Sequence, residues 1–442
     1  MHREKSRVIK GHAMPKNKKP TKWMKLDNAA LIYPATMNRS WTALFRLSAT
    51  LTEPIDEDIL EVAQKRTLRR LPWFAYRLKR GLFWFYLEHS DDLPKIEQDV
   101  ANPCVRMRLN ENDGFCMRVR YYHNRIAVEF FHVLTDGTGG QVFLQTLVAE
   151  YLRLKYGANI PRDEKILDCS EEPKPEEAED SFAVHSGKIT QTRKEVKAYH
   201  IKGTDERNGF VHIITGSMNA SDVLAKAKEK GVSATVYLTA ALILSVDAIQ
   251  RRRVPNIHKY KPVKISVPVN LRNVFRSKTL RNFANYVNPG IDPRLGEYTF
   301  DEVLNIVHHT LAMEVTEKLL NVKITTNVRS EQNKLLRLTP LFIKNMALKY
   351  VYSQVGDVLS STTISNLGVA KLPDEMSQYV RRMDFILGPL ADNRVCCAAL
   401  TYKGRLRINF TRTIQEPWLE REFFTRLVKL GIPVKVESNQ RE

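Results

Sequence analysis

The sequence predicts a mixed α/β protein in which a linker joins two lobes. Three observations support this fold class. The chain has 442 residues, which is more than one hydrophobic core usually serves. Strand-like and helix-like apolar patterns occur in both halves. An acidic, proline-bearing stretch separates the halves, so we expect lobes at 26–162 and 206–442, with an exposed linker and crossover at 163–205.

Apolar spacing and helix-stopping residues predict the elements of the first lobe. Pro54 precedes a run of apolar residues at helical spacing, and Pro72 ends it. Alternating apolar residues on both sides of His123-Asn124 indicate two paired strands. The expected elements are strands at 41–47, 82–87, 117–122 and 125–132, and helices at 55–71 and 139–152.

The second lobe shows the same mixture of patterns. Ser221 is the expected N-cap of a helix that ends at Gly231. The apolar run at 234–246 is too short to span a bilayer, so it predicts a buried helix. Further expected elements are strands at 209–216, 263–268, 395–402 and 405–413, and helices at 301–317, 339–354 and 417–430.

The net charge of +20 is unevenly distributed. Residues 1–25 hold nine Lys or Arg and one acid, which predicts a basic, disordered tail. Residues 163–180 hold nine acids and two lysines, and the remaining excess of positive charge is spread over the folded part. Such an excess suits an anionic membrane surface, an acidic substrate or a phosphate-bearing cofactor, and charge alone does not choose among them.

The five cysteines have no CxxC spacing, which favours unpaired thiols in a reducing, cytoplasmic location. The sequence has no signal-peptide pattern, no GxSxG or P-loop motif, and no HExxH or Cys/His cluster, so we expect no metal. No nucleic-acid-binding motif is seen in the folded part.

The segment 130–140 contains the pattern HxxxDG. By strand alternation, His132 shares an apolar, inward face with Phe130. A neutral imidazole with a pKa near 6.5 suits removal of a proton from a hydroxyl or amine at neutral pH. His132 is therefore a candidate general base, or else a satisfied core histidine. Asp136 either folds back to brace the backbone and pair with an arginine, or simply caps the helix that follows.

HxxxDG at a strand end resembles the active-site motif of the chloramphenicol-acetyltransferase-like superfamily. This superfamily includes alcohol acetyltransferases, plant BAHD acyltransferases, wax-ester synthases and the condensation domains of peptide synthetases. The resemblance covers about residues 23–430 and is closest to the alcohol acetyltransferases. Its further segments are Trp23-x-x-Leu26-Asp27, Val267-Pro-Val-Asn-Leu-Arg272, Asn282-Phe-Ala-Asn285 and Ser365-Asn-Leu-Gly368.

Two departures narrow the resemblance. Many condensation domains carry HHxxxDG, whereas this chain has Phe131 in place of the first histidine. The DFGWG motif of the plant branch is absent. The first departure argues against a condensation domain that depends on a carrier protein, and the second argues against the plant BAHD branch.

The resemblance implies two lobes with mixed sheets flanked by helices and an active-site tunnel between them. It also implies that acyl-coenzyme A is the co-substrate, that no cofactor is permanently bound, and that a small-molecule or lipid alcohol is the acceptor. The base would be His132, with Asp136 paired to Arg272 as a structural brace and Gly137 keeping the backbone close to the site.

The remaining site residues have two interpretations each. Ser365 and Asn366 are candidates to hydrogen-bond the oxyanion or the acceptor, or else they form a turn after a strand. A basic run could bind the phosphates of coenzyme A, or else it forms a solvated loop. Its members are Lys264, Arg276, Lys278 and Arg281.

Three functional hypotheses remain open at this point. The leading one is a coenzyme-A-dependent O-acyltransferase, and an N-acyltransferase that acts on an amine is its nearest alternative. Another is a non-catalytic basic protein that binds nucleic acid or an anionic membrane. The last is the same fold without activity. We expect a monomer with no specific nucleic-acid partner, at most peripherally associated with a membrane.

Overall fold

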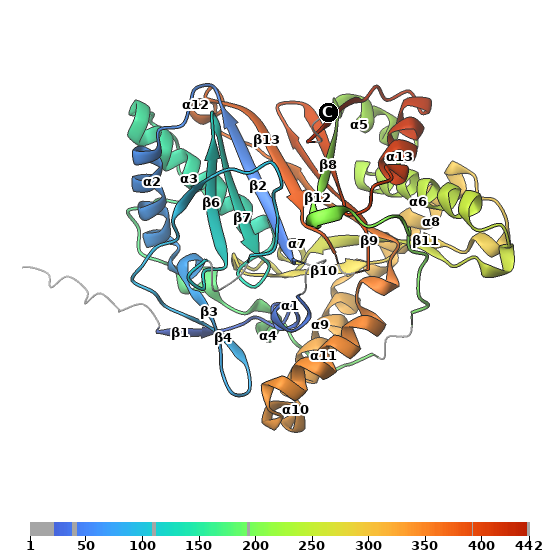
Figure 1. Cartoon of the computed structure of the whole chain (residues 1–442), viewed down its shortest axis with the longest axis horizontal. Helices are drawn as coiled ribbons and strands as arrows, with labels where there is room; N and C mark the ends of the chain where they lie inside the picture. Colours follow the sequence, from blue (N-terminus) through green and yellow to red (C-terminus); the bar gives the residue numbers. More distant parts are fainter. Residues whose placement is uncertain (1–21, 38–41, 108–111, 192–194, 391, 440–442) are drawn as a thin grey trace, which may run out of the picture.

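The computed structural model describes residues 22–37, 42–107, 112–191, 195–390 and 392–439. A five-stranded sheet dominates the first half of the chain, and a larger sheet dominates the second half (Figure 1). The first sheet contains, in spatial order, β13 (Val380–Leu387), β2 (Leu44–Leu51), β7 (Arg125–Phe131), β6 (Met117–Tyr122) and β5 (Ile96–Gln98).

The second sheet has eight strands, of which β11 (Gly290–Ile291) pairs with β9 beside the main path. Its strand β12 is parallel to both neighbours, whereas most other pairs are antiparallel. The predicted mixed α/β class is thus confirmed. In spatial order the other strands are β10 (Ala284–Val287), β9 (Val263–Asn270), β12 (Thr362–Val369), β14 (Val395–Tyr402), β15 (Arg405–Arg412), β8 (His212–Asn219) and β16 (Lys435–Ser438).

Helices cover the sheets on their outer sides (Figure 1). In the first half, α2 (Glu57–Arg70) packs on α3 (Gly137–Tyr156), which lies on β2. In the second half, α6 (Ala234–Arg253) packs against α8 (Phe300–Glu314) and α13 (Trp418–Lys429). A separate arm projects from the molecule and contains α9 (Glu317–Gln332), α10 (Lys334–Leu338) and α11 (Leu341–Val355).

The apolar run at 234–246 is a buried helix, as predicted, because α6 is covered almost all round. Among the described residues, no single helix has the length and hydropathy to cross a bilayer. Together with α5 (Ala220–Glu229), α6 would pass that test, but the two helices are bent by 86°. The predicted cap at Ser221 is wrong: β8 runs to Asn219, and α5 begins directly after it.

The strand β14 lies between two hydrophobic cores. Its residues Cys396, Ala398 and Leu400 belong to the core of the first half, and Cys397 and Ala399 to the core of the second. Successive side chains of a strand point to opposite faces, so both faces of β14 are buried. This explains why the strand is apolar throughout, and its small side chains let the two cores approach closely.

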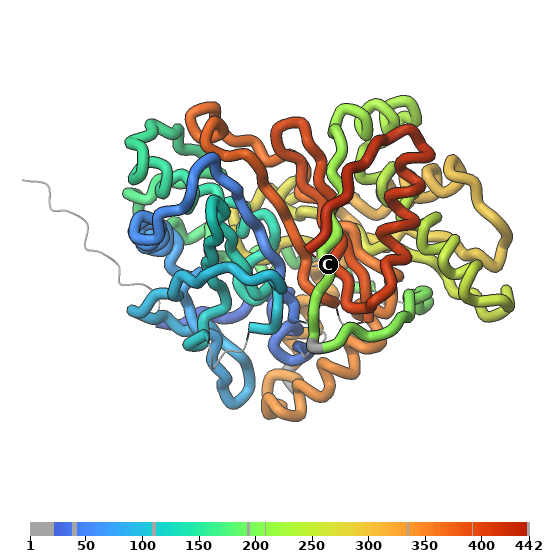
Figure 2. Tube along the Cα trace, turned by 45° about the horizontal axis from the view of Figure 1, so that its top comes forward, coloured from blue at the N-terminus to red at the C-terminus, as the bar shows by residue number. Residues whose placement is uncertain are grey.

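The predicted boundary at residue 206 does not separate the sheets completely. The strand β13 belongs to the second half by sequence, yet it pairs along its length with β2 of the first half. Tyr402 and Asn409 of the second sheet also hydrogen-bond the β13 backbone, at Val380 O (3.0 Å) and Phe385 O (2.9 Å). In Figure 2 the orange β13 runs beside the blue β2. The two halves therefore share a strand.

The linker is not an exposed tether as predicted. Glu177 is only 7% exposed, and its carboxylate accepts from both terminal nitrogens of Arg70, at 2.6 and 2.7 Å. Phe182 is also buried. A buried guanidinium on α2 thus draws the acidic segment onto the surface of the first half.

The last residues of the predicted disordered tail, 1–25, are in fact part of a sheet. Trp23–Lys25 form β1, which pairs with β4 (Phe85–Glu88) in a small sheet completed by β3 (Arg77–Arg80). The rest of the predicted tail, residues 1–21, lies outside the described residues.

Candidate active site

The His132 side chain lies where the two halves meet. The residue directly follows β7, and its backbone N–H donates to Ala43 O at 3.0 Å. Its ring stacks on Tyr33, with centroids 5.3 Å apart, and lies 4.7 Å from the ring of Phe45. His132 is partly exposed, whereas its neighbours in sequence are buried. The imidazole ring is therefore packed against aromatic side chains but remains partly accessible to solvent.

Asn282, from the second half, determines which ring nitrogen of His132 is free. Its Nδ2 donates to His132 O at 2.7 Å and to Asp27 Oδ2 at 3.1 Å. Its Oδ1 therefore faces the ring, 3.4 Å from His132 Nδ1. An amide oxygen only accepts, so the hydrogen sits on Nδ1 and the lone pair on Nε2. The neutral ring thus has its acceptor nitrogen available to a substrate.

Burial lowers the pKa of His132 below its ordinary value of 6.5. The hydrogen bond to Asn282, the charge of Asp136 and the backbone of Thr135 act in the opposite direction but do not cancel this effect. A histidine of this kind is neutral at physiological pH. Burial also raises the pKa of Asp27 to about 6, although the charge of Arg281 opposes the rise.

Asp136 uses both of its oxygens for structural bonds. Oδ1 accepts from Thr138 N at 3.1 Å and Gly139 N at 3.2 Å, which caps α3. Oδ2 accepts from Arg272 Nη1 at 2.8 Å and Phe283 N at 2.9 Å. The same Asp136 carboxylate therefore caps α3 with one oxygen and pairs with Arg272 through the other. With both oxygens occupied, Asp136 is poorly placed to act as a base.

The glycines of the motif allow a close approach of the two halves. A Cβ at Gly137 would lie 2.6 Å from Leu367 Cδ2, and one at Gly139 would lie 2.0 Å from Leu280 O. Contacts this short exclude a side chain without movement of the backbone at Leu280. The N-terminus of α3 therefore touches segments of the second half directly.

Ser365 and Asn366 lie on β12 with different surroundings. Asn366 donates to Thr235 Oγ1 at 3.1 Å and accepts from Gly368 N at 2.9 Å, so it holds the irregular end of the strand. These bonds use one N–H and the oxygen of its amide. Ser365 is partly exposed, and its hydroxyl makes no hydrogen bond to residues that the structure describes. Of the two candidates, Ser365 is the one whose side chain makes no hydrogen bond within the described residues, whereas Asn366 uses one of its two N–H groups.

The predicted basic run does not form one cluster. Arg281 is 3% exposed, donates to Lys25 O at 2.7 Å and lies 3.5 Å from Asp27, so it is a buried structural residue. Lys264 pairs with Glu195 at 3.3 Å. The candidates that stay exposed are Arg276 and Lys278.

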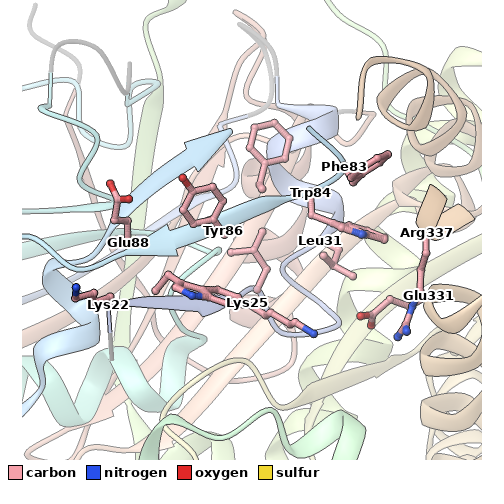
Figure 3. Close-up of a pocket in the computed structure, with 12 residues that line it drawn as sticks. Lys22, Lys25, Leu31, Phe83, Trp84, Tyr86, Glu88, Glu331 and Arg337 are labelled. Atoms are coloured by element: carbon pink, nitrogen blue, oxygen red, sulfur yellow. The ribbon is translucent and has the colours of Figure 1, made fainter. Parts of the chain in front are cut away.

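A cavity of about 740 Å³ lies beside this site without containing His132 (Figure 3). It opens between the small sheet and the projecting arm, with Trp84 and Leu31 on one side and Glu331 and Arg337 on the other. The segment 26–33 contributes to both places, since Leu31 lines the cavity and Tyr33 stacks on His132. The tunnel predicted between the lobes stays a prediction.

Several solved structures share the overall fold of this chain. TRI101 from F. graminearum, complexed with coenzyme A and deoxynivalenol, has a TM-score of 0.61 at 12% identity, over 92% of this chain and 97% of that one. The starter condensation domain of rhizomide synthetase, in complex with C8-CoA and Leu-SNAC, has a TM-score of 0.58 at 11% identity, over 93% and 95%.

Polyketide synthase associated protein 5 from Mycobacterium tuberculosis has a TM-score of 0.54 at 16% identity, over 92% of this chain and 97% of that one. The chain has the chloramphenicol-acetyltransferase-like fold. No protein-family model and no curated relative matches the sequence. The likeness to proteins of the chloramphenicol-acetyltransferase-like fold therefore rests on three-dimensional structure, and it confirms the fold predicted from the sequence motifs.

Sequence reasoning named His132, Asp136 and Arg272 but missed the residues that hold the ring. Asn282 stood in a segment that resembles the superfamily, yet no role was assigned to it. Tyr33 had no sequence signal, because its stacking partner lies about a hundred residues further along the chain.

Proposed function

We propose that this protein transfers an acyl group from a coenzyme A thioester to an alcohol, as an acyltransferase of the alcohol acetyltransferase type. The observation that carries the proposal is the neutral His132 ring, held by Asn282 with Nε2 free, at the junction of a chloramphenicol-acetyltransferase-like fold. Solved TRI101 structures with this fold hold coenzyme A together with deoxynivalenol or T-2, which supports the choice of donor.

In the proposed reaction, His132 Nε2 takes the proton of the acceptor hydroxyl while the oxygen attacks the thioester carbonyl carbon. The carbonyl π electrons move to oxygen and form a tetrahedral oxyanion. Collapse of this intermediate breaks the C–S bond and expels the thiolate of coenzyme A. The thiolate then takes the proton from His132, which returns to its neutral form.

Ser365 is the proposed donor to the oxyanion, because its hydroxyl is not engaged by described residues, whereas the amide of Asn366 is held by Thr235 and Gly368 at the end of β12. Asp136 and Arg272 are proposed as positioning residues. Their ion pair fixes the start of α3 against the loop that carries Asn282.

Arg276 and Lys278 are the proposed contacts for the phosphates of coenzyme A. Both are exposed, unlike Arg281. Replacement of both by Gln should raise KM for acyl-coenzyme A and leave kcat nearly unchanged, because phosphate binding is equal in ground and transition states. An unchanged KM would assign these residues to a solvated loop.

The activity is tested by measuring thiol release from a panel of acyl-coenzyme A donors, with and without alcohols and amines. Alcohol-dependent thiol release is expected, and His132→Ala should reduce it by roughly 10²–10⁴-fold. His309→Ala, at an exposed histidine of α8, is the matched control and should keep full activity. Thiol release that occurs only with amines would mean that the acceptor is an amine rather than an alcohol. Full activity of a folded His132→Ala protein would contradict the proposal.

A further inference from the structure

The projecting arm carries an apolar surface that faces away from the rest of the molecule. On α11, Phe342, Met346 and Tyr350 are 60%, 71% and 70% exposed, at successive spacings of four residues. Such residues share one face of a helix. A surface helix of a globular protein usually turns its polar face outward, so the pattern of α11 is reversed.

The turn of the β3–β4 hairpin extends this surface. Leu341 N donates to Leu82 O at 2.9 Å, and Lys344 Nζ donates to Phe83 O at 2.8 Å, which fastens the hairpin turn to the start of α11. Leu82 is 73% exposed. Figure 1 shows the hairpin and α10 projecting from the same side of the molecule. We define the apolar face by six residues: Leu82, Leu338, Phe342, Ile343, Met346 and Tyr350.

Basic residues outnumber acids in the two segments that form the apolar face. Residues 333–356 contain four Lys or Arg, of which Lys344 is buried, and no acid. Residues 77–84 contain three Lys or Arg and no acid. Lys22 and Arg337 line the cavity beside the face (Figure 3). The acids that line the same cavity are Glu88 and Glu331, and Glu88 lies 3.7 Å from Lys79.

The chain that precedes the described structure adds to this charge. Residues 1–21 hold seven Lys or Arg and one Glu, and they join the structure at Lys22, which lines the cavity next to α10. Basic segments beside an apolar surface are attracted to anionic lipid headgroups. Positive charge is thus present beside the face, and the sequence that joins the structure at Lys22 carries more of it.

We propose that the apolar face is a docking surface for an anionic lipid bilayer. The apolar side chains enter the interfacial region of the bilayer, while the lysines and arginines contact its headgroups. A second copy of the chain fits less well, because a two-fold interface through this face would oppose two basic surfaces. The docked orientation would bring the mouth of the cavity to the bilayer. The proposal concerns binding and does not depend on the proposed reaction.

The test uses co-sedimentation of the full chain with vesicles of phosphatidylcholine alone, or with phosphatidylserine added. We expect binding to the phosphatidylserine vesicles that weakens with salt, and little binding to phosphatidylcholine alone. Phe342→Ser with Met346→Ser should reduce the partition coefficient about tenfold or more. Leu224→Ser with Leu295→Ser, at leucines 57% and 80% exposed elsewhere, is the matched control and should bind like the unaltered chain.

A second variant keeps the test informative if the first fails to fold. Arg80→Gln with Lys349→Gln should weaken binding to phosphatidylserine vesicles several-fold while leaving the circular dichroism spectrum unchanged. The proposal is overturned if the unaltered chain stays in the supernatant with both vesicles, or if the control loses as much binding as the Phe342 variant. A dimer that the Phe342 variant abolishes would assign the face to self-association instead.

Discussion

The histidine and the aspartate of the HxxxDG segment have separate roles. Asp136 is occupied by a helix cap and an arginine, whereas His132 is left neutral with one nitrogen free. The link between them is Asn282, whose neighbour Phe283 also donates its backbone N–H to Asp136. A change at the ion pair is therefore expected to reach the imidazole through the backbone of this loop.

The first prediction concerns pH. Because the base must be neutral, kcat/KM should fall as pH falls through an apparent pKa below 6.5, and it should be flat at neutral pH. Asn282→Ala removes a hydrogen bond that raises the pKa of His132, so the acid limb should move to still lower pH while kcat drops. The measurement is a pH profile for both proteins. An acid limb above pH 6.5, or one that Asn282→Ala leaves in place, would contradict this assignment.

The second prediction concerns the brace. Asp136→Asn and Arg272→Ala should each lower activity by misplacing His132, and their effects should overlap because they break the same ion pair. A double-mutant cycle on kcat/KM should give a coupling of about 0.5–3 kcal/mol. The control is Asp136→Asn with Arg294→Ala, an exposed arginine that pairs with Asp292, for which additivity is expected. Additive effects of the first pair would remove Arg272 from its role.

Sequence reasoning reached the motif residues because their spacing is local, and it failed where a partner is distant. The lysines and arginines from Lys264 to Arg281 formed one basic run by composition. In the fold, Arg281 turns inward toward Asp27, more than 250 residues earlier, while Arg276 and Lys278 turn outward. Composition gives the charge of a residue, but it does not show which carboxylate the residue will pair with in the fold.

At the scale of elements, the acidic segment 163–180 lies where it does because of one buried side chain, Arg70. A run with nine acids and two prolines in residues 163–180 was expected to stay in solvent. Instead, η2 (Pro175–Ala178) is docked on the first half through the ion pair of Glu177 with Arg70. The guanidinium of Arg70 is fully buried at the end of α2. Nothing in the pattern of either segment identifies the other as its partner.

The third prediction follows from this contact. Glu177→Gln removes the hydrogen-bonded counter-charge of a buried guanidinium and leaves only the half-exposed Glu171, 3.9 Å away. It should therefore lower the free energy of unfolding by about 3–5 kcal/mol. Glu176→Gln, at the exposed neighbouring position, should change it by less than about 0.5 kcal/mol. Urea unfolding followed by circular dichroism compares the two. Equal, small effects would mean that the linker contributes little to stability.

At the scale of the whole molecule, the strands and helices of both halves were largely predicted, but the strand that joins the halves was not. Periodicity indicates that a segment is a strand, and it does not say which sheet receives it. No strand was expected at 380–387, although β13 occupies that range and completes the first sheet. The two lobes are therefore not independent units.

The fourth prediction is that the halves unfold together. In Trp418→Phe, the remaining tryptophans all belong to the first half, so fluorescence follows that half while circular dichroism follows the whole chain. The two urea midpoints should coincide. Phe385→Ala, in the shared strand, should lower both midpoints equally. A first half that unfolds at a separate midpoint would show that the shared strand does not couple the lobes.

The shared strand also bears on synthesis. Roughly 330 residues separate β2 from β13, which at about 5–20 residues per second means that the ribosome needs tens of seconds to deliver the missing strand. During that interval the nascent first half presents the backbone edge of β2 without its final partner, and such edges promote aggregation. The growing chain is therefore expected to need a chaperone until β13 has emerged.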